Sequence, residues 1–431
     1  MIPLAESFEN LLDFLTGAGL HRAIRLFWHF FFLDFPRYIL TDAVLLITAL
    51  LWGKERRRER VLPSPGTPLV TVIMPVLNEQ YTLFRSIQSL HDQTYRPIEI
   101  VLIDDGSSDA TPAVCRDLAR RFQNRRPFRM PERSGKAAGL KLGVHYARGD
   151  IICFVDGDTT FDRDAIAELV APFSDPGVGC VSGNVRVRNP RDNLLTEIQN
   201  LEYGLTIAVG RRIRSRLGIL SIVSGAFGAF RREIVEAAGG HDPGPGNDSD
   251  LTIKFRKLGY RIAFAPKAVC MTDVPTTVGA LVRQRRRWSR NLIRNRVFKH
   301  GNLFHPHYRT FDWLNALANA DGLFFHVFLA FTSLLYLFDL ALNFPTMLPF
   351  LLFVNYLLYS TADLFETLVM MYFSERRSMD SLSLLYWPLF NLYKRSMKLV
   401  RVYAYVEELL FKRSHADPFA PARIRGEIPR W

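Results

Sequence analysis

The stretch DIICFVDGDTTF, residues 150–161, limits the possible folds more than any other part of the chain. Its apolar, β-favouring run Ile151–Val155 predicts a short buried strand. Asp156, Gly157 and Asp158 follow directly, so the strand delivers two carboxylates to the carboxyl edge of a sheet, where open α/β folds bind ligands. Such a pair, completed by substrate phosphates, typically holds Mg²⁺, although Asp-x-Asp alone is also ordinary turn chemistry.

The 431-residue chain has a charged middle part, residues 63–300, between apolar ends rich in Phe and Leu. This profile predicts a cytosolic domain carried by membrane segments. The four cysteines are scattered without a CxxC pair, which favours a reduced compartment over disulfides or zinc. The net charge of +13 is concentrated in residues 54–60 and 283–299, beside apolar segments, and so favours an anionic membrane surface over nucleic acid.

Apolar segments on both sides of this middle part predict the membrane attachment. Residues 6–33 mix apolar and charged side chains and predict an interfacial helix, and residues 38–52 predict a short transmembrane segment. The basic run after it places the N-terminus outside and the middle domain in the cytosol. Residues 323–343 and 345–373 are each long enough to span, whereas residues 381–410 fit a span, a re-entrant piece or an interfacial helix. The predicted domains are 1–60, 61–300 and 301–411, followed by a tail, 412–431.

Strands and helices alternate through the middle domain. Three segments predict buried strands, each leading toward a helix: residues 69–76, 97–104 and 151–155. This alternation is typical of a parallel, doubly wound α/β sheet. The second half is less regular, with strands predicted at 178–188 and 219–233 around a long helix at 193–216. The chain contains neither G-x-G-x-x-G nor a P-loop motif, which argues against the dinucleotide and P-loop versions of this architecture.

Seven short motifs follow one another in the middle domain: PVLNE (75–79), DDGSSD (104–109), GKAAGL (135–140), VDGD (155–158), SGAFGAFRRE (224–233), NDSDLT (247–252) and QRRRW (284–288). Through them, residues 69–295 resemble the membrane-embedded, processive family 2 glycosyltransferases, the group of cellulose, chitin, hyaluronan and poly-N-acetylglucosamine synthases. VSGNVRVR and LEYG look closest to the poly-N-acetylglucosamine synthases. The resemblance implies a GT-A (Rossmann-like) fold, a UDP-sugar donor, a growing polysaccharide as acceptor, and Mg²⁺ or Mn²⁺.

Sugar transfer from such a donor requires the diphosphate charge to be neutralised as the bond to the sugar breaks. Asp156 and Asp158 are expected to hold a divalent ion that does this as a Lewis acid. Lys136, at a predicted helix start, adds positive charge, unless it is a solvated surface lysine.

The nucleoside is expected to meet the ends of the first two strands. Asp105, beside Asp104, would accept the imide N–H of uracil, although one of the two aspartates alternatively caps a helix. Glu79 alternatively favours the N-terminus of the next helix. The residues assigned to donor binding are Pro75, Asn78, Glu79, Asp104, Asp105, Lys136, Asp156, Gly157 and Asp158.

The acceptor hydroxyl must lose a proton, which requires a carboxylate that the metal does not use. By resemblance this general base is Asp248, with Asn247 in place of the acid that usually precedes it. Asp250 remains a rival, and one of the two aspartates alternatively caps the following helix.

The basic motif at 284–288 completes the set of predicted catalytic residues. On a helix, Gln284, Arg287 and Trp288 share one face through i, i+3 and i+4 spacing. The resemblance implies an indole platform for a sugar beside a diphosphate-binding arginine, although an arginine run also permits a nucleic-acid interpretation. The remaining arginines are expected to form a membrane-facing basic surface: Arg283, Arg285, Arg286, Arg290, Arg294 and Arg296.

The leading prediction is therefore a processive, inverting β-glycosyltransferase of the inner or plasma membrane. It would polymerise UDP-N-acetylglucosamine or UDP-glucose into an exported polysaccharide, in contact with membrane lipids and an accessory membrane or export subunit. The alternative is a ceramide-type lipid glycosyltransferase that adds a single sugar. A third alternative is a membrane-bound nucleic-acid or scaffold protein. Such a protein needs no acidic cluster, so the acidic motifs of this chain argue against it. Nothing in the sequence fixes the sugar.

Overall fold

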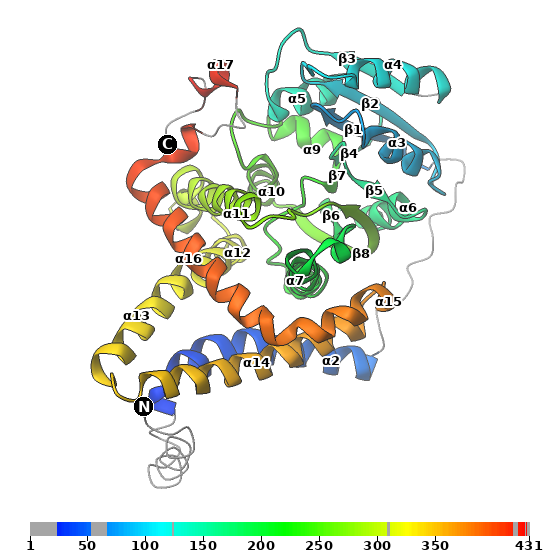
Figure 1. The fold of residues 1–431 in the computed structure, drawn as a ribbon. Helices are drawn as coiled ribbons and strands as arrows, with labels where there is room; N and C mark the ends of the chain where they lie inside the picture. The colour runs from blue at the N-terminus through cyan, green and yellow to red at the C-terminus, as the bar shows by residue number, and fades with distance from the viewer. Residues whose placement is uncertain are drawn as a thin grey trace. The chain divides into compact units, whose positions relative to one another are not determined.

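The computed structural model describes residues 24–52, 67–122, 125–307, 311–416, 421–426 and 428. The chain divides into two compact units. One contains Met1–Glu55 and Phe324–Val402, and the other contains Arg56–Leu323 and Tyr403–Trp431. Figure 1 shows the elements of both units, and the domain limits expected from the sequence stay predictions.

The larger unit is built around a mixed sheet of eight described strands in the order β3-β2-β1-β4-β7-β6-β8-β5 (Figure 1). The strands are β1 (Val70–Val76), β2 (Ile98–Asp104), β3 (Arg125–Arg129), β4 (Ile151–Val155), β5 (Thr160–Phe161), β6 (Val178–Val187), β7 (Phe227–Arg231) and β8 (Arg261–Thr272). The predicted GT-A-like α/β fold is confirmed by this sheet and its helices. The strand at residues 151–155 was predicted with its observed bounds, whereas β3 was not predicted.

One interior strand and one edge strand of the sheet run against the others. β3, β2, β1 and β4 are parallel, whereas β7 runs antiparallel to both β4 and β6. β8 is parallel to β6, and the short edge strand β5 is antiparallel to β8. Six of the eight described strands therefore run in one direction, and the prediction of a parallel sheet is wrong only for β7 and β5. Residues 188–226, between β6 and β7, are a long connection, and strand–helix alternation does not fix the direction of a strand that follows one.

Helices cover both faces of the parallel half, because β1 buries alternate side chains on opposite sides. Val72 and Met74 pack in a core with Leu83 of α3, whereas Ile73 packs on the other side with Leu140 of α5. The helices of this unit are α3 (Leu83–His91), α4 (Thr111–Arg121), α5 (Lys136–Tyr146), α6 (Ala165–Val170), α7 (Leu194–Tyr203), α8 (Gly210–Arg216), α9 (Arg232–Ala237), α10 (Asn247–Lys257), α11 (Val278–Ile293), α12 (Trp313–Leu323) and α17 (Ala422–Arg425).

The predicted helix at 193–216 is confirmed, with a π-helical turn, Gly204–Val209, between α7 and α8. The strand predicted at 219–233 is shorter than expected, since β7 begins at Phe227 and α9 at Arg232. Residues 219–226 instead form the loop that leads into β7, and this loop contains part of the site described below.

The smaller unit is helical in its described part. Its elements are two π-helical segments, Phe30–Asp34 and Pro36–Leu40, followed by α2 (Thr41–Trp52), α13 (Leu329–Asn343), α14 (Leu348–Phe373), α15 (Arg377–Asp380) and the first part of α16 (Trp387–Phe411). Two helical stretches in the described chain, Trp313–Asn343 and Leu348–Phe373, are long and apolar enough to cross a membrane.

These two stretches correspond to the spans predicted after the middle domain. The short N-terminal segment at 38–52 is helical where predicted but is not one of the two candidate spans. Residues 6–23 of the predicted interfacial helix and the basic run at 54–60 lie outside the described residues.

Candidate active site

The first group of candidate residues stands where β1, β2 and β4 end. Val76 pairs with Asp104 across the β1–β2 ladder, and β4 is parallel to β1 on its other side. Because the carboxyl ends of parallel strands meet at one edge, Asn78, Asp105 and Asp156 follow their strands at the same edge of the sheet. The sequence therefore placed these three positions together correctly.

Asn78 and Glu79 join the loop after β1 to the loop after β2. Asn78 adopts a left-handed backbone conformation with φ 58°, which asparagine tolerates better than most residues. Its Oδ1 accepts a hydrogen bond from the Ser108 amide at 3.0 Å, and the Glu79 amide donates to Thr111 Oγ1 at 2.8 Å. These bonds fix the edge of the site on which the nucleoside contacts were predicted.

The two adjacent aspartates have different structural roles. Asp104 Oδ1 accepts from the Ser107 amide at 3.0 Å within the polar turn, and the alternative of a helix cap is wrong, because α4 has Ala110 as its N-cap with no side-chain cap bond. Asp105 reaches the loop before α5, where its Oδ1 accepts from the amides of Ser134 and Gly135 at 2.7 and 3.0 Å. Burial raises the pKa of Asp105, and these backbone bonds oppose the shift. In this structure Asp105 positions the loop that leads into Lys136.

Lys136 is the first residue of α5, and its ammonium forms an ion pair with the Asp156 carboxylate. Burial lowers the pKa of Lys136, but the negative charges of Asp156, Asp248 and Asp158 more than compensate and raise it. The lysine is therefore part of a charge cluster rather than an isolated surface residue. It remains cationic at neutral pH.

The acidic residues beside Lys136 form a compact group. The pKa of Asp158 is raised by burial and by the charge of Asp156, and the pKa of Glu79 is raised by burial and by the charges of both aspartates. A Cβ added at Gly157 would lie 2.8 Å from Val76 Cγ1, so only glycine lets the Asp-Gly-Asp turn pack this closely on β1.

The donor set fits a hard divalent cation, since carboxylates that repel one another are stabilised by such an ion. No group of three or more His, Cys, Asp or Glu side chains within the described chain is arranged to hold a metal. Asp156 and Asp158 would therefore supply two ligands and leave the other positions to phosphate and water, which is common for Mg²⁺.

Asp248 faces the same cluster from the second half of the domain. A Cβ added at Gly225, in the loop before β7, would lie 3.5 Å from Asp248 Cβ and 3.7 Å from Lys136 Nζ. Asp248 and Lys136 thus meet across the bare backbone of Gly225.

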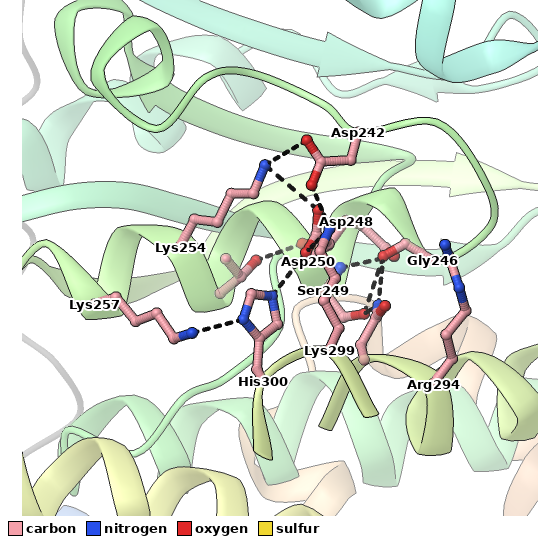
Figure 2. Close-up of polar contacts among 12 residues, drawn as sticks. Asp242, Gly246, Asp248, Ser249, Asp250, Lys254, Lys257, Arg294, Lys299 and His300 are labelled. Atoms are coloured by element: carbon pink, nitrogen blue, oxygen red, sulfur yellow. Dashed lines mark hydrogen bonds and ion pairs between the residues drawn. The ribbon is translucent and has the colours of Figure 1, made fainter. Parts of the chain in front are cut away.

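Asp250, the predicted rival of Asp248, is enclosed by basic groups (Figure 2). It is buried, and its Oδ1 lies 2.8 Å from His300 Nε2 and 2.6 Å from Lys299 Nζ, with Lys254 3.7 Å from Oδ2. Burial alone would raise its pKa, but His300 and the two lysines hold that pKa well below the usual range. The geometry therefore favours Asp248 as the base and gives Asp250 an anchoring role for α10.

Asn247, which stands where the family usually has an acid, closes the loop before α10. With its amide NH₂ turned toward the loop, it donates to the carbonyl oxygens of Asp242 and Gly244 at 3.2 and 2.6 Å. A carboxylate donates no hydrogen bond there. An asparagine at position 247 therefore suits this loop better than an acid. Asp242, in the same loop, also forms an ion pair with Lys254, with 2.9 Å between Oδ1 and Nζ (Figure 2).

The predicted residues of the QRRRW motif lie on α11. Position 246, two residues before Asp248, packs against this helix, since a Cβ added at Gly246 would lie 3.1 Å from Asn291 Cβ. Arg287 is one helical turn before Asn291 and shares its face. Trp288 is 43% exposed, which leaves its ring accessible. Helix α11 thus passes beside the start of α10.

The prediction of a membrane-facing arginine surface is wrong for much of this run. Arg285, Arg294 and Arg296 are buried, and each bonds within the protein. Arg294 donates to the Pro245 carbonyl at 2.7 Å, and Arg296 donates to Ser221 Oγ at 2.6 Å. Arg286 and Arg290 pair with Glu407, and Arg283 is exposed. Sequence adjacency to an apolar segment did not reveal these partners, which are distant in the chain.

Arg211, on α8, was not predicted from the sequence to be a site residue. Its Nη1 donates to Ser182 Oγ at 2.7 Å. Burial lowers the pKa of Arg211 to about 10, and the negative charge of Asp248 opposes that shift. The sequence segments VSGNVRVR and LEYG, noted above for their resemblance, contain Ser182 and Tyr203. Neither segment includes residue 211, and no motif spacing pointed to it.

Comparison with known proteins finds a family match in the middle domain. Residues 71–239 match the model described as Glycosyl transferase family 2. Residues 71–239 therefore form a glycosyl transferase family 2 domain. For this domain, the match confirms the predicted resemblance to family 2 glycosyltransferases. It also confirms the predicted enzyme class, a glycosyltransferase.

Two relatives that match this domain are both named for N-acetylglucosamine. An N-acetylglucosaminyltransferase of Azorhizobium caulinodans is 34% identical over 54% of this chain and 61% of its own length. A poly-beta-1,6-N-acetyl-D-glucosamine synthase of Staphylococcus aureus is 32% identical over 51% of this chain and 53% of its own. The matches thus span little more than half the length of these relatives.

A solved structure shares the fold. The mannosyltransferase PcManGT of Pyrobaculum calidifontis, in complex with GDP-Man and Mn²⁺, superposes with a TM-score of 0.61 at 24% identity. The match covers 88% of this chain and 97% of that one. This similarity supports the GT-A assignment of the sheet and its helices.

Proposed function

We propose that this protein is a membrane-embedded, processive β-glycosyltransferase that polymerises a sugar from UDP-N-acetylglucosamine or UDP-glucose into an exported polysaccharide. The observation that carries the proposal is the meeting of Lys136 and Asp248 at Gly225 in a family 2 domain, with Asp156 paired to the same lysine. A cation, a metal-binding carboxylate and a carboxylate held apart from the metal site are the groups that transfer from a nucleotide sugar requires.

Donor binding is assigned to the edge formed by β1, β2 and β4. Asp156 and Asp158 would hold Mg²⁺ or Mn²⁺, which supplies Lewis-acid neutralisation of the diphosphate. The Lys136 ammonium, at the N-terminus of α5, stabilises the negative charge that develops on the leaving UDP. Asp105 keeps the loop at Ser134 and Gly135 in place, so that Lys136 starts its helix at the diphosphate.

Asp248 is the proposed general base. As an acceptor hydroxyl attacks the anomeric carbon, the new C–O bond forms and the bond from that carbon to the diphosphate breaks. The proton passes to the Asp248 carboxylate, and the electron pair leaves with UDP. Attack opposite the leaving group inverts the anomeric configuration. Asp248 suits this role because it faces Lys136 across Gly225, whereas Asp250 is held by cations.

The acceptor is proposed to be the growing polysaccharide, with a sugar ring resting on Trp288. The names of the two relatives favour N-acetylglucosamine as the sugar. The apolar stretches Trp313–Asn343 and Leu348–Phe373 support membrane attachment, with lipids and an accessory export subunit as further partners. A catalytic domain on the cytosolic side fits the cytosolic supply of UDP-sugars.

A donor screen tests this function. The purified protein, reconstituted in lipid vesicles with Mg²⁺ or Mn²⁺, is given radiolabelled UDP-N-acetylglucosamine, UDP-glucose or UDP-glucuronate in separate reactions. We expect a ladder of products or a polymer from one of the first two donors. A single labelled lipid product carrying one sugar would contradict polymerisation and support the lipid glycosyltransferase instead.

Labelling in intact cells tests the orientation. With Ser64→Cys in the segment before the domain, we expect protection from impermeant thiol reagents until the cells are permeabilised, because the basic run at 54–60 favours the cytoplasmic side. Ready labelling in intact cells would put the domain outside and contradict the use of UDP-sugars.

A further inference from the structure

Arg285 is the second residue of the QRRRW motif and is not one of the residues proposed to bind the donor or the acceptor. It lies on α11 between Gln284 and Arg287, and its side chain is 3% exposed. Its Nη2 lies 2.5 Å from Glu202 Oε2, near the end of α7, and this carboxylate is itself largely buried. A buried ion pair between two helices holds its members in one geometry, because loss of either partner leaves an uncompensated charge.

The same guanidinium contacts two of the proposed catalytic residues. Its Nη1 donates to Gln284 Oε1 at 3.0 Å, and its Cζ lies 4.3 Å from the centre of the Trp288 ring. On its other side it lies 6.0 Å from the ring of Tyr203. A planar guanidinium stacks on aromatic rings and donates in fixed directions at the same time, which an ammonium does not do.

We propose that the Arg285–Glu202 pair is a positioning device for the acceptor platform. Glu202 fixes the guanidinium, and the guanidinium in turn orients the Gln284 amide and the Trp288 ring. Arg285 and Glu202 touch neither donor nor acceptor in this scheme, so they are positioning residues. The inference rests on the proposed function, because that function gives Trp288 its sugar.

The adjacent Arg286 provides a matched control. It lies on the same helix and also pairs with a glutamate, donating from its Nε to Glu407 Oε2 at 2.8 Å. Its guanidinium stacks on Tyr403 at 5.0 Å instead of Trp288. Arg286→Lys and Glu407→Gln therefore make the same chemical changes as Arg285→Lys and Glu202→Gln at a pair that does not contact the platform.

The kinetic test compares the Michaelis constants for acceptor oligosaccharide and for UDP-sugar in these four variants. Arg285→Lys keeps the charge opposite Glu202 but loses the planar face. We expect a rise of roughly tenfold in the acceptor KM with shorter products, which corresponds to about 1.4 kcal/mol. The donor KM should stay within about twofold, and the control variants should match wild type. An unchanged acceptor KM and product length in folded Arg285→Lys protein would overturn the inference, as would equal changes in both Michaelis constants.

A spectroscopic test does not depend on turnover. Of the six tryptophans, all but Trp288 are replaced by phenylalanine, and the anisotropy and acrylamide quenching of Trp288 are measured. We expect Arg285→Lys and Glu202→Gln to increase ring motion and quenching, and Arg286→Lys to change neither. If no UDP-sugar is transferred but this result holds, the proposed function fails while the positioning pair stands. Equal Trp288 motion in all variants would contradict the pair itself.

Discussion

The two sides of the candidate site are built differently. On the donor side, Asp105, Asp156 and Lys136 follow strands or begin a helix at one sheet edge, and their partners lie within the parallel half of the sheet. On the acceptor side, Asp248 and Trp288 lie on α10 and α11. Contacts between helices support these two helices, among them Arg285–Glu202 and Asp250–Lys299.

This difference has a consequence for the effects of mutation. A strand end positions its side chain through the sheet, so a donor-side substitution should remove one function and leave the fold intact. A helix held by buried ion pairs depends on each member of the pair. Acceptor-side substitutions should therefore divide into those that alter chemistry and those that alter position or stability.

The largest effect is expected on the donor side. Asp156→Asn removes a proposed metal-binding carboxylate and the partner of Lys136, and transfer should fall by roughly a thousandfold or more, because metal stabilisation of charge is worth several kcal/mol. Radiolabel incorporation measures the loss. Asp92→Asn, at an exposed position after α3, should retain activity. EDTA should mimic Asp156→Asn in the wild type, and full activity in the chelator would contradict the metal assignment.

The next effect concerns stability on the acceptor side. Asp250→Asn removes the buried carboxylate that Lys299, Lys254 and His300 share. Asp242 still pairs with both lysines, so the domain should lose roughly 1–3 kcal/mol, seen as a lower melting temperature. Because the folded-state pKa of Asp250 is lowered, its stabilisation is present above the ordinary carboxyl range and is lost as the pH falls below about 4. The difference from wild type should therefore shrink below that pH.

A surface pair provides the comparison for Asp250. Asp175 pairs with Arg261, whose side chain is 64% exposed, and Asp175→Asn should cost about 0–1 kcal/mol. Equal melting temperatures for Asp250→Asn and Asp175→Asn proteins would show that the buried cluster does not anchor α10.

A smaller, selective effect is expected at the platform. Trp288→Ala removes the exposed ring and should raise the acceptor KM by roughly tenfold, with short products and nearly normal UDP binding by calorimetry, since aromatic contacts are worth about 0.5–1.5 kcal/mol. If Trp288 is instead a packing residue at the membrane interface, the alanine variant should melt earlier and lose UDP affinity in parallel. Polymer of normal length from folded Trp288→Ala protein would rule out a role in holding the chain.

The smallest effect is expected at Gly225, where the two sides meet. The added methyl of Gly225→Ala would sit at ordinary contact distance from both Asp248 and Lys136, so the protein should fold with an unchanged melting temperature. The methyl narrows the space between Asp248 and Lys136, and turnover should fall by about threefold, because small misplacements of reacting groups lower the rate. Gly218→Ser is the control for replacing a glycine. A Cβ added at Gly218 meets nothing within 4 Å, and the φ of +71° there adds some backbone strain. Unchanged turnover in Gly225→Ala would argue against substrate groups between Lys136 and Asp248.

The same contrast explains how much the sequence revealed. Strand ends are readable because apolar runs and the acids after them are local, so Asp156 and Asp105 were placed at one edge correctly. The arginines of α11 were misread because their partners, such as Glu202 and Pro245, are far away in the chain. The reversed direction of β7 was missed because a long connection precedes it, and Arg211 had no motif spacing to indicate it.

The most direct test of the central claim is a paired measurement on Asp248→Asn protein, with UDP affinity by calorimetry and sugar transfer by radiolabel. The account predicts a UDP affinity within about twofold of wild type and a loss of turnover of roughly 10²–10⁴-fold, the range of general base catalysis. The donor side would then be intact and the proton acceptor missing. Turnover near the wild-type value in folded Asp248→Asn protein, or a loss of UDP affinity that matches the loss of turnover, would contradict the account.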